Sequence, residues 1–196
     1  MCWTPTATAA MIGLGAVATT VTLRRGDPLA IPLTLGYFTL MEGLQFAGFM
    51  VIDQCGSPAN RTVTFLSFLH IAFQPFFINA FAMQLVPEGV RGRASLAVYG
   101  ICACSAIAML LQLYPFEWAG SCRPGSTLCG TALCTVSGSW HLAWDVPYNG
   151  LMNWAEDATG LMWGFPTYVV TVFLVPLFYG AWRFVLFHAL AGPFLA

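Results

Sequence analysis

The 196-residue chain contains no lysine, and only 8% of its residues are charged. Soluble domains carry about 25% charged residues, so the composition argues against a water-soluble fold. Seven arginines against eight acidic residues leave a formal charge of −1, and no basic patch is present to bind nucleic acid. Internal repeats, which are typical of transporters, are also lacking. In contrast, 58% of the residues are hydrophobic and the mean hydropathy is +0.74, which indicates a multi-pass membrane protein.

Long apolar runs predict an all-α transmembrane bundle of about five spanning helices, forming a single domain over residues 1–196. The runs cover residues 6–23, 31–52, 63–86, 94–116 and 165–190. A further stretch, residues 139–163, carries several charges that are costly at membrane depth. We interpret it as an interfacial or re-entrant helix, and a sixth crossing is the alternative. No positive charge precedes the first apolar run, so we expect a retained helix there and not a cleaved signal peptide.

The arginines predict the orientation of the bundle. Arg24 and Arg25 follow the first run, and Arg91 and Arg93 follow the third. Because cytoplasmic loops hold the excess of positive charge, we expect both loops in the cytoplasm. The N-terminus and an interfacial segment over residues 117–164 then lie outside, and the C-terminus lies in the cytoplasm. The expected location is a bacterial inner membrane.

Most of the cysteines fall on the predicted outer side, where disulfides can form. These are Cys2, Cys55, Cys122, Cys129 and Cys134. They allow at most two disulfides, and a bond from Cys55 into the 122–134 cluster would fasten the outer segment over the bundle. The pairing stays open. A zinc or iron–sulfur site is the weaker alternative because the spacing lacks Cys-x2-Cys pairs.

Polar and ionisable side chains at membrane depth are costly, and they mark candidate functional positions by default. Glu42, Ser67 and His70 lie within the second and third runs. His141 and Asp145, in the outer segment, would share a face at i and i+4 if that stretch is helical. We hypothesise a zinc site near the outer leaflet, ligated by His70 and His141 with Asp145 or Glu42 as the third ligand. The other carboxylate would be the general base, and Ser67 or Tyr148 an oxyanion donor, in the hydrolysis of a membrane lipid.

Two other interpretations of the same residues stay open. In the first, the side chains at membrane depth form an interhelical hydrogen-bond network, namely Glu42, Ser67, His70, Gln74 and Asn79. Alternatively, His70 could hold a haem or a chlorophyll-type pigment. The chain would then be a non-catalytic accessory subunit of a larger respiratory or photosynthetic membrane complex, with membrane lipids and other membrane subunits as its partners.

Two runs of the sequence resemble an uncharacterised family of bacterial multi-pass membrane proteins, namely Phe68–Asn79 and Trp140–Gly150. That resemblance extends over nearly the whole chain and implies no activity. Separately, Ser67 preceding His70 on a spanning helix is similar to the pattern of the alkaline ceramidase-like zinc-dependent membrane hydrolases, and it implies a zinc site. That superfamily carries His-x3-His on its final helix, whereas this chain has His188 alone.

Overall fold

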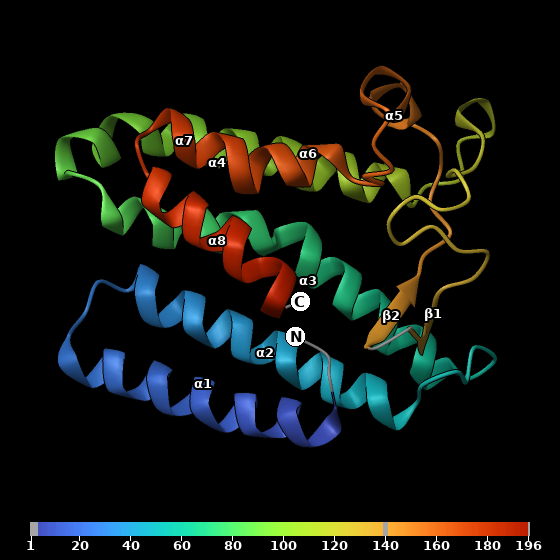
Figure 1. Cartoon of the computed structure of the whole chain (residues 1–196), viewed down its shortest axis with the longest axis horizontal. Coiled ribbons are helices and arrows are strands. Elements are labelled where there is room, and N and C mark those ends of the chain that lie inside the picture. The colour runs from blue at the N-terminus through green and yellow to red at the C-terminus, as the bar shows by residue number, and fades with distance from the viewer. Residues whose placement is uncertain (1–3, 139–140, 196) are drawn as a thin grey trace.

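Long antiparallel helices form the body of the molecule in the computed structural model, which describes residues 4–138 and 141–195 (Figure 1). They are α1 (Pro5–Arg25), α2 (Ala30–Met50), α3 (Pro58–Ala82) and α4 (Glu88–Gln112). A 3₁₀ turn, Met83–Leu85, extends α3. Each long helix packs against the next one along the chain. Cys2 and Trp140, which the sequence analysis singled out, lie outside the described residues.

The ends of α1 follow from its sequence. The hydroxyl group of Thr4 accepts a hydrogen bond from the backbone N–H of Ala7 at 3.1 Å, which caps the first turn. The helix ends at Gly26, whose φ of 73° lies in the left-handed region that favours glycine. Arg24 and Arg25 occupy the last turn, where their charge opposes the negative end of the helix dipole. The first predicted run therefore forms a helix that ends at the predicted arginine turn.

Small residues set the close contact between α1 and α2. A side chain at Gly15 would collide with Thr39, and one at Gly36 would lie 3.6 Å from the methyl group of Thr19. The hydroxyl groups of Thr19 and Thr39 donate back to carbonyls of their own helices, so these two polar groups are satisfied at the contact. This glycine–threonine contact is typical of helices packed within a membrane.

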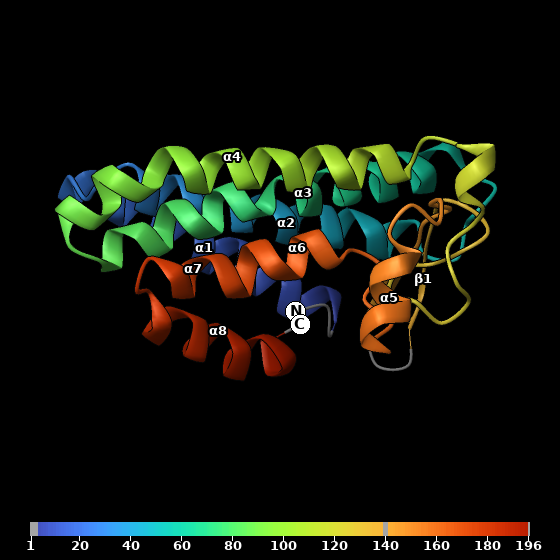
Figure 2. The same cartoon turned by 90° about the horizontal axis from the view of Figure 1, so that it is seen from above.

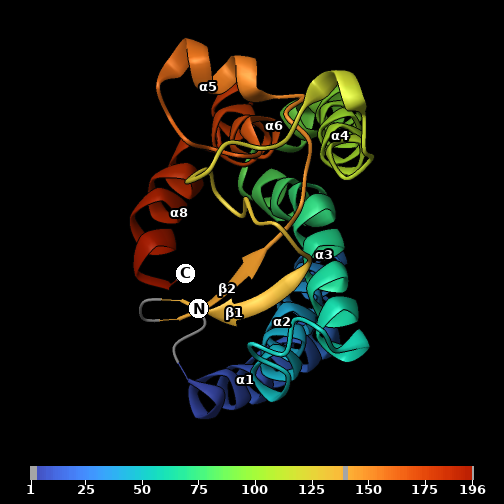
Figure 3. The same ribbon diagram turned by 90° about the vertical axis from the view of Figure 1, so that its right-hand side faces the viewer.

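The segment between α4 and α6 folds into a small cap over one end of the bundle, which we call the cap end. It contains a 3₁₀ turn (Glu117–Ala119), an antiparallel hairpin of β1 (Cys134–Ser137) and β2 (Leu142–Asp145), and the short helix α5 (Asn153–Thr159). Figure 3 looks onto this end, where β1 contacts α3 and β2 contacts α2. The described part of residues 139–163 does not form the single helix that was predicted, because Leu142–Asp145 is a strand of the hairpin and only Asn153–Thr159 is helical.

The predicted fifth span, residues 165–190, is also wrong as a continuous helix. The chain forms α6 (Pro166–Val169), a π-helical turn (Val170–Leu174) and α7 (Val175–Phe178), and then reverses into α8 (Trp182–Leu195). Figure 2 shows α8 running back beside α6 and α7. The reversal occurs at Gly180, whose φ of 91° ends the helix in the left-handed region. The C-terminal part of the bundle is therefore a helical hairpin.

Within the described part of the chain, three helical segments are long and apolar enough to cross a membrane. They are Pro5–Arg25, Pro58–Leu85 and Glu88–Gln112. Helix α2 is as long as α1, with 21 residues, and carries Glu42 and Gln45. The protein is thus mostly helical and compatible with a membrane, and the number of about five spans is not confirmed.

Candidate functional site

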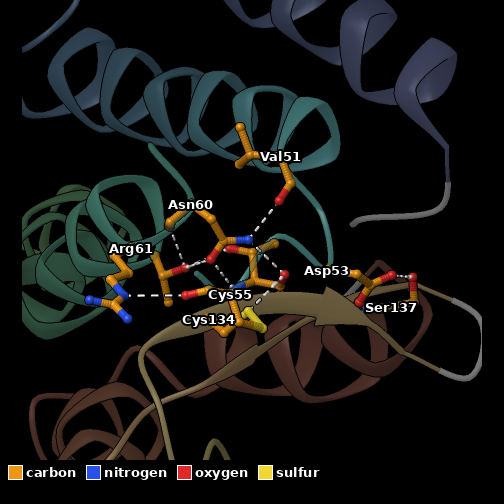
Figure 4. Close-up of a disulfide and its surroundings, with 9 residues drawn as sticks. Val51, Asp53, Cys55, Asn60, Arg61, Cys134 and Ser137 are labelled. Carbon is orange, nitrogen blue, oxygen red and sulfur yellow. Dashed lines mark hydrogen bonds between the residues drawn. A yellow bond between two sulfur atoms is a disulfide. The ribbon is translucent and has the colours of Figure 1, made fainter. Parts of the chain in front are cut away.

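A polar clasp, which we define as Asn60, Thr64 and Thr135, holds the hairpin against the start of α3 (Figure 4). The side-chain amide of Asn60 donates to the carbonyls of Val51 at 2.7 Å and Thr135 at 3.0 Å, and its Oδ1 accepts from the Thr135 N–H at 3.0 Å. The hydroxyl groups of Thr64 and Thr135 lie 2.8 Å apart. All three clasp side chains are buried. The clasp therefore serves structure, since its members satisfy one another.

Asp53 and a disulfide reinforce the clasp (Figure 4). The carboxylate of Asp53 accepts hydrogen bonds from the hydroxyl group of Ser137 at 2.6 Å and from its N–H at 2.8 Å. These two bonds hold the pKa of Asp53 below its usual value. Cys55 and Cys134 form a disulfide beside them. Of the pairings that the sequence left open, the structure has the one that joins Cys55 to the 122–134 cluster.

The second disulfide joins the two remaining cysteines of the cluster, Cys122 and Cys129. Near it, the side-chain amide of Asn149 donates to the carbonyls of Leu111 at 2.8 Å and Tyr114 at 2.6 Å. Carbonyls at a helix C-terminus lack partners within the helix, so Asn149 caps the end of α4. The cap is thus fastened to both α3 and α4.

The predicted zinc site is not assembled. Among the described residues, no three His, Cys, Asp or Glu side chains gather as a metal ion requires. His141 directly precedes β2 and Asp145 is its last residue, so four residues of extended chain, about 13 Å, separate them. They do not share a helical face. The ring Nδ1 of His141 lies 2.7 Å from the carbonyl oxygen of Leu142. His70, which belongs to α3, is not grouped with them.

Glu42 and Ser67, the predicted catalytic residues, are brought to the same level of the bundle. Tyr37 on α2 donates to the carbonyl of His70 on α3 at 2.6 Å, which sets the register of the two helices. Along the axis of α2, Glu42 lies about 7.5 Å from Tyr37 toward the cap. Along the axis of α3, Ser67 lies about 4.5 Å from His70 in the same direction. Both Ser67 Oγ and Glu42 Oε2 are buried and have no hydrogen-bond partner among the described residues. They share a level but form no bond with each other.

Asn79 does belong to an interhelical network, as one of the open interpretations proposed. Its amide donates to the carbonyl of Thr171 at 3.1 Å, and its Oδ1 accepts from the hydroxyl group of Tyr179 at 3.0 Å. In a π-helical turn, each carbonyl accepts from the N–H five residues later, so the carbonyl of Thr171 would pair with residue 176. That residue is Pro176, which has no N–H to donate. The free carbonyl is therefore taken by Asn79, and this bond joins α3 to the C-terminal hairpin.

An apolar groove of about 750 Å³ lies between α2 and α3. It is lined by Tyr37, Leu40, Leu44, Leu66, Leu69, His70, Phe73, Phe76 and Phe77. Leu40, Leu66 and Phe73 are 57%, 44% and 41% exposed, so the groove opens on the surface of the bundle. No charged residue lines it. The sequence analysis did not identify this groove.

His70 lines the edge of the groove, whereas Ser67, three residues earlier on α3, does not. The ring of His70 stacks on Tyr37 with centroids 3.7 Å apart, and Tyr37 stacks equally closely on Phe77. The hydroxyl group of Tyr168 on α6 donates to Gln74 at 2.8 Å, so the face of α3 that carries Ser67 and Gln74 points toward α6. His70 is only 5% exposed, and its buried Nε2 has no partner in the described chain. Ser67 and His70 thus lie on neighbouring parts of one side of α3, but only His70 lines the groove.

Residues 6–196 match a family of unknown function, DUF5765. The chain belongs to this family. No curated protein and no solved structure matches it. The resemblance to an uncharacterised family therefore holds at this level, while the similarity to alkaline ceramidase-like hydrolases has no support.

For this DUF5765 protein, sequence reasoning missed the roles of Asn60 and Tyr37. Asn60 precedes the predicted run of residues 63–86, so the sequence analysis did not place it with Thr64 on one helical face, as α3 does. Their partner Thr135 lies in a different part of the chain, and no spacing rule could pair them. Tyr37 had no signal beyond being an aromatic residue in an apolar run.

Proposed function

We propose that this is a non-catalytic integral membrane protein that binds a membrane-dissolved apolar ligand in the groove between α2 and α3. The observation that carries this proposal is the groove itself, with its leucine and aromatic walls and its single imidazole. Its volume of about 750 Å³ lies within the range of small-ligand sites, which are mostly apolar with few polar groups. Binding such a ligand is compatible with an accessory role in a larger membrane assembly.

In the proposed topology, α1 to α4 each cross the membrane and the C-terminal hairpin enters it part-way. The turns after α1 and α3 lie at the same end of the bundle (Figure 1). They carry the arginines, so we place that end in the cytoplasm. The opposite end carries both disulfides, which agrees with an oxidising outer side. A bacterial inner membrane is the proposed location.

A pair of matched variants tests ligand binding. L66W fills the groove, whereas L96W places the same side chain on α4, outside the groove, where Leu96 is 85% exposed. Wild type and L96W, purified in mild detergent, are expected to retain a near-stoichiometric apolar compound on organic extraction and mass spectrometry. L66W is expected to lose it. Equal amounts in all three proteins, or no compound in wild type, would contradict the proposal.

A metal-dependent lipid hydrolase is the second candidate, favoured by the unpartnered Ser67 and Glu42 at one level. It requires stoichiometric zinc in the purified protein and fatty-acid release from vesicles that S67A or E42Q abolishes. Under our proposal, elemental analysis finds no zinc and the vesicles release no fatty acid. A haem or pigment on His70 would instead produce visible absorbance that H70F removes.

A further inference from the structure

We propose that a small monovalent metal cation binds between α2 and α3, one helical turn below the clasp. Its protein ligands are side-chain oxygens of Glu42, Gln45 and Ser67. The proposal goes beyond the groove ligand, because none of these three residues lines the groove. Three observations carry it, namely the alignment of the two helices, the oxygens that lack a partner, and the charge.

Two contacts fix the alignment of α2 and α3, which pack side by side as antiparallel helices (Figure 1). Toward the end opposite the cap, the hydroxyl group of Thr34 donates to the carbonyl of Phe77 at 3.0 Å. At the cap end, a side chain at Gly48 would lie 3.3 Å from the methyl group of Thr135, whose hydroxyl group lies 2.8 Å from that of Thr64. Position 34 is therefore level with position 77, and position 48 with position 64.

This alignment places Gln45 opposite Ser67. Gln45 lies one turn before Gly48 among the buried residues of α2, and Ser67 lies one turn after Thr64 among those of α3. Both therefore belong to the sides of the helices that face each other just below the clasp. Glu42 precedes Gln45 by one turn, about 4.5 Å along α2. A cation between the two helices is thus within reach of all three side chains.

Each of these side chains holds an oxygen that has no partner in the described part of the chain. Gln45 is 4% exposed and Ser67 is 0% exposed, yet Oε1 of Gln45 and Oγ of Ser67 form no hydrogen bond there. Oε2 of Glu42 is also buried and unbonded. Amide and carboxylate oxygens only accept hydrogen bonds, so they need a donor or a cation. Because unpaired oxygens in a protein interior are costly, the three point to a bound partner.

Charge selects a monovalent cation as that partner. Glu42 is the single acidic residue within α1, α2 and α3. The basic residue at the cap end of α3, Arg61, is exposed, and it donates to the carbonyl of Cys55 at 3.2 Å. One carboxylate balances one positive charge, whereas a divalent ion would leave a net charge buried. A ligand set made only of oxygen suits a hard ion, and water would complete its shell.

Thermal unfolding in mild detergent tests the site. NaCl is titrated up to about 0.5 M against choline chloride, which holds the ionic strength constant with a cation too large for the site. When Na⁺ exceeds its dissociation constant about tenfold, the wild-type midpoint is expected to rise by about 3–6 °C. E42Q removes the charge, keeps the shape, and is expected to lose this rise. A wild-type midpoint that is the same in NaCl and choline chloride, or an equal rise in E42Q, overturns the proposal.

Two serine variants separate ligation from a general effect on packing. S67A removes a ligand and is expected to weaken Na⁺ binding about tenfold. S105A removes a hydroxyl group on α4 that is also buried and without a partner among the described residues, and its Na⁺ response should match that of wild type. Equal losses of Na⁺ affinity in S67A and S105A would overturn the role of Ser67.

Radiolabelled sodium measures binding independently of stability. Wild type is expected to retain near-stoichiometric Na⁺ in detergent, and E42Q is expected to retain none. In choline chloride, the midpoint of E42Q should be no lower than that of wild type, because this variant buries no unpaired charge. That result shows that E42Q is folded. Equal amounts of bound Na⁺ in the two proteins, or no bound Na⁺ in wild type, would overturn the cation site.

Discussion

Removing the Cys55–Cys134 disulfide is expected to destabilise the protein more than removing the Cys122–Cys129 disulfide. A disulfide restricts the unfolded chain, and its contribution grows with the logarithm of the loop that it closes. The sequence separations are 79 and 7 residues. The chain-entropy relation gives about 4.5 kcal/mol for the first disulfide and about 2.4 kcal/mol for the second. The longer loop is thus worth about 2 kcal/mol more.

The helices inside the longer loop reduce this difference only slightly. If α3 and α4 remain helical in the unfolded state, the flexible loop is shorter, and halving its length lowers the contribution by about 0.6 kcal/mol. A difference of about 1.5 kcal/mol therefore remains. For a chain of this size, 1 kcal/mol shifts the midpoint of thermal unfolding by about 2–4 °C.

The assay compares the paired variants C55A/C134A and C122A/C129A with wild type in the same detergent, without reductant. Circular dichroism first checks that each variant retains its helix content, and thermal unfolding then gives the midpoints. We expect the midpoint of C55A/C134A to lie about 3–6 °C below that of C122A/C129A. A midpoint of C122A/C129A at or below that of C55A/C134A would refute the loop-length argument.

Two other predictions concern the helix contact and the pH response. G15A is expected to lower the free energy of unfolding by about 1–3 kcal/mol, because its methyl group collides with Thr39. The control G13A has open space around it and should stay within about 0.5 kcal/mol of wild type. Equal shifts of the thermal unfolding midpoint in the two variants would contradict this packing. The lowered pKa of Asp53 implies a stabilisation that is present above the unfolded pKa of about 3.9 and is lost as the pH falls through the folded value. The exchange rate of the Ser137 amide hydrogen, corrected for its intrinsic pH dependence, should therefore rise in wild type relative to the rate in D53N as the pH falls from 7 to 3. A constant ratio of the two rates would show that the contact between Asp53 and Ser137 does not depend on pH.

The candidate site shows how far local patterns reach. His141 and Asp145 have a spacing that suits one face of a helix, yet they lie at the two ends of a short strand region. That strand, β2, pairs with β1, and β1 is anchored by the bonds of Cys134 to Cys55 and of Thr135 to Asn60, whose positions lie far back in the chain. A local rule cannot detect such anchors, so it assigned the wrong period to this segment.

Amino-acid composition was sufficient to predict a helical protein suited to a membrane, because a polar backbone in hydrocarbon must satisfy its hydrogen bonds within each helix. The positions of the cysteines were sufficient to predict that disulfides form outside the apolar runs, but not which cysteines pair. Tertiary structure alone decided that the last apolar run reverses at Gly180, that Tyr37 meets His70, and that Asn60 meets Thr135. These outcomes depend on which helices become neighbours, and that choice is made by packing between residues distant in sequence.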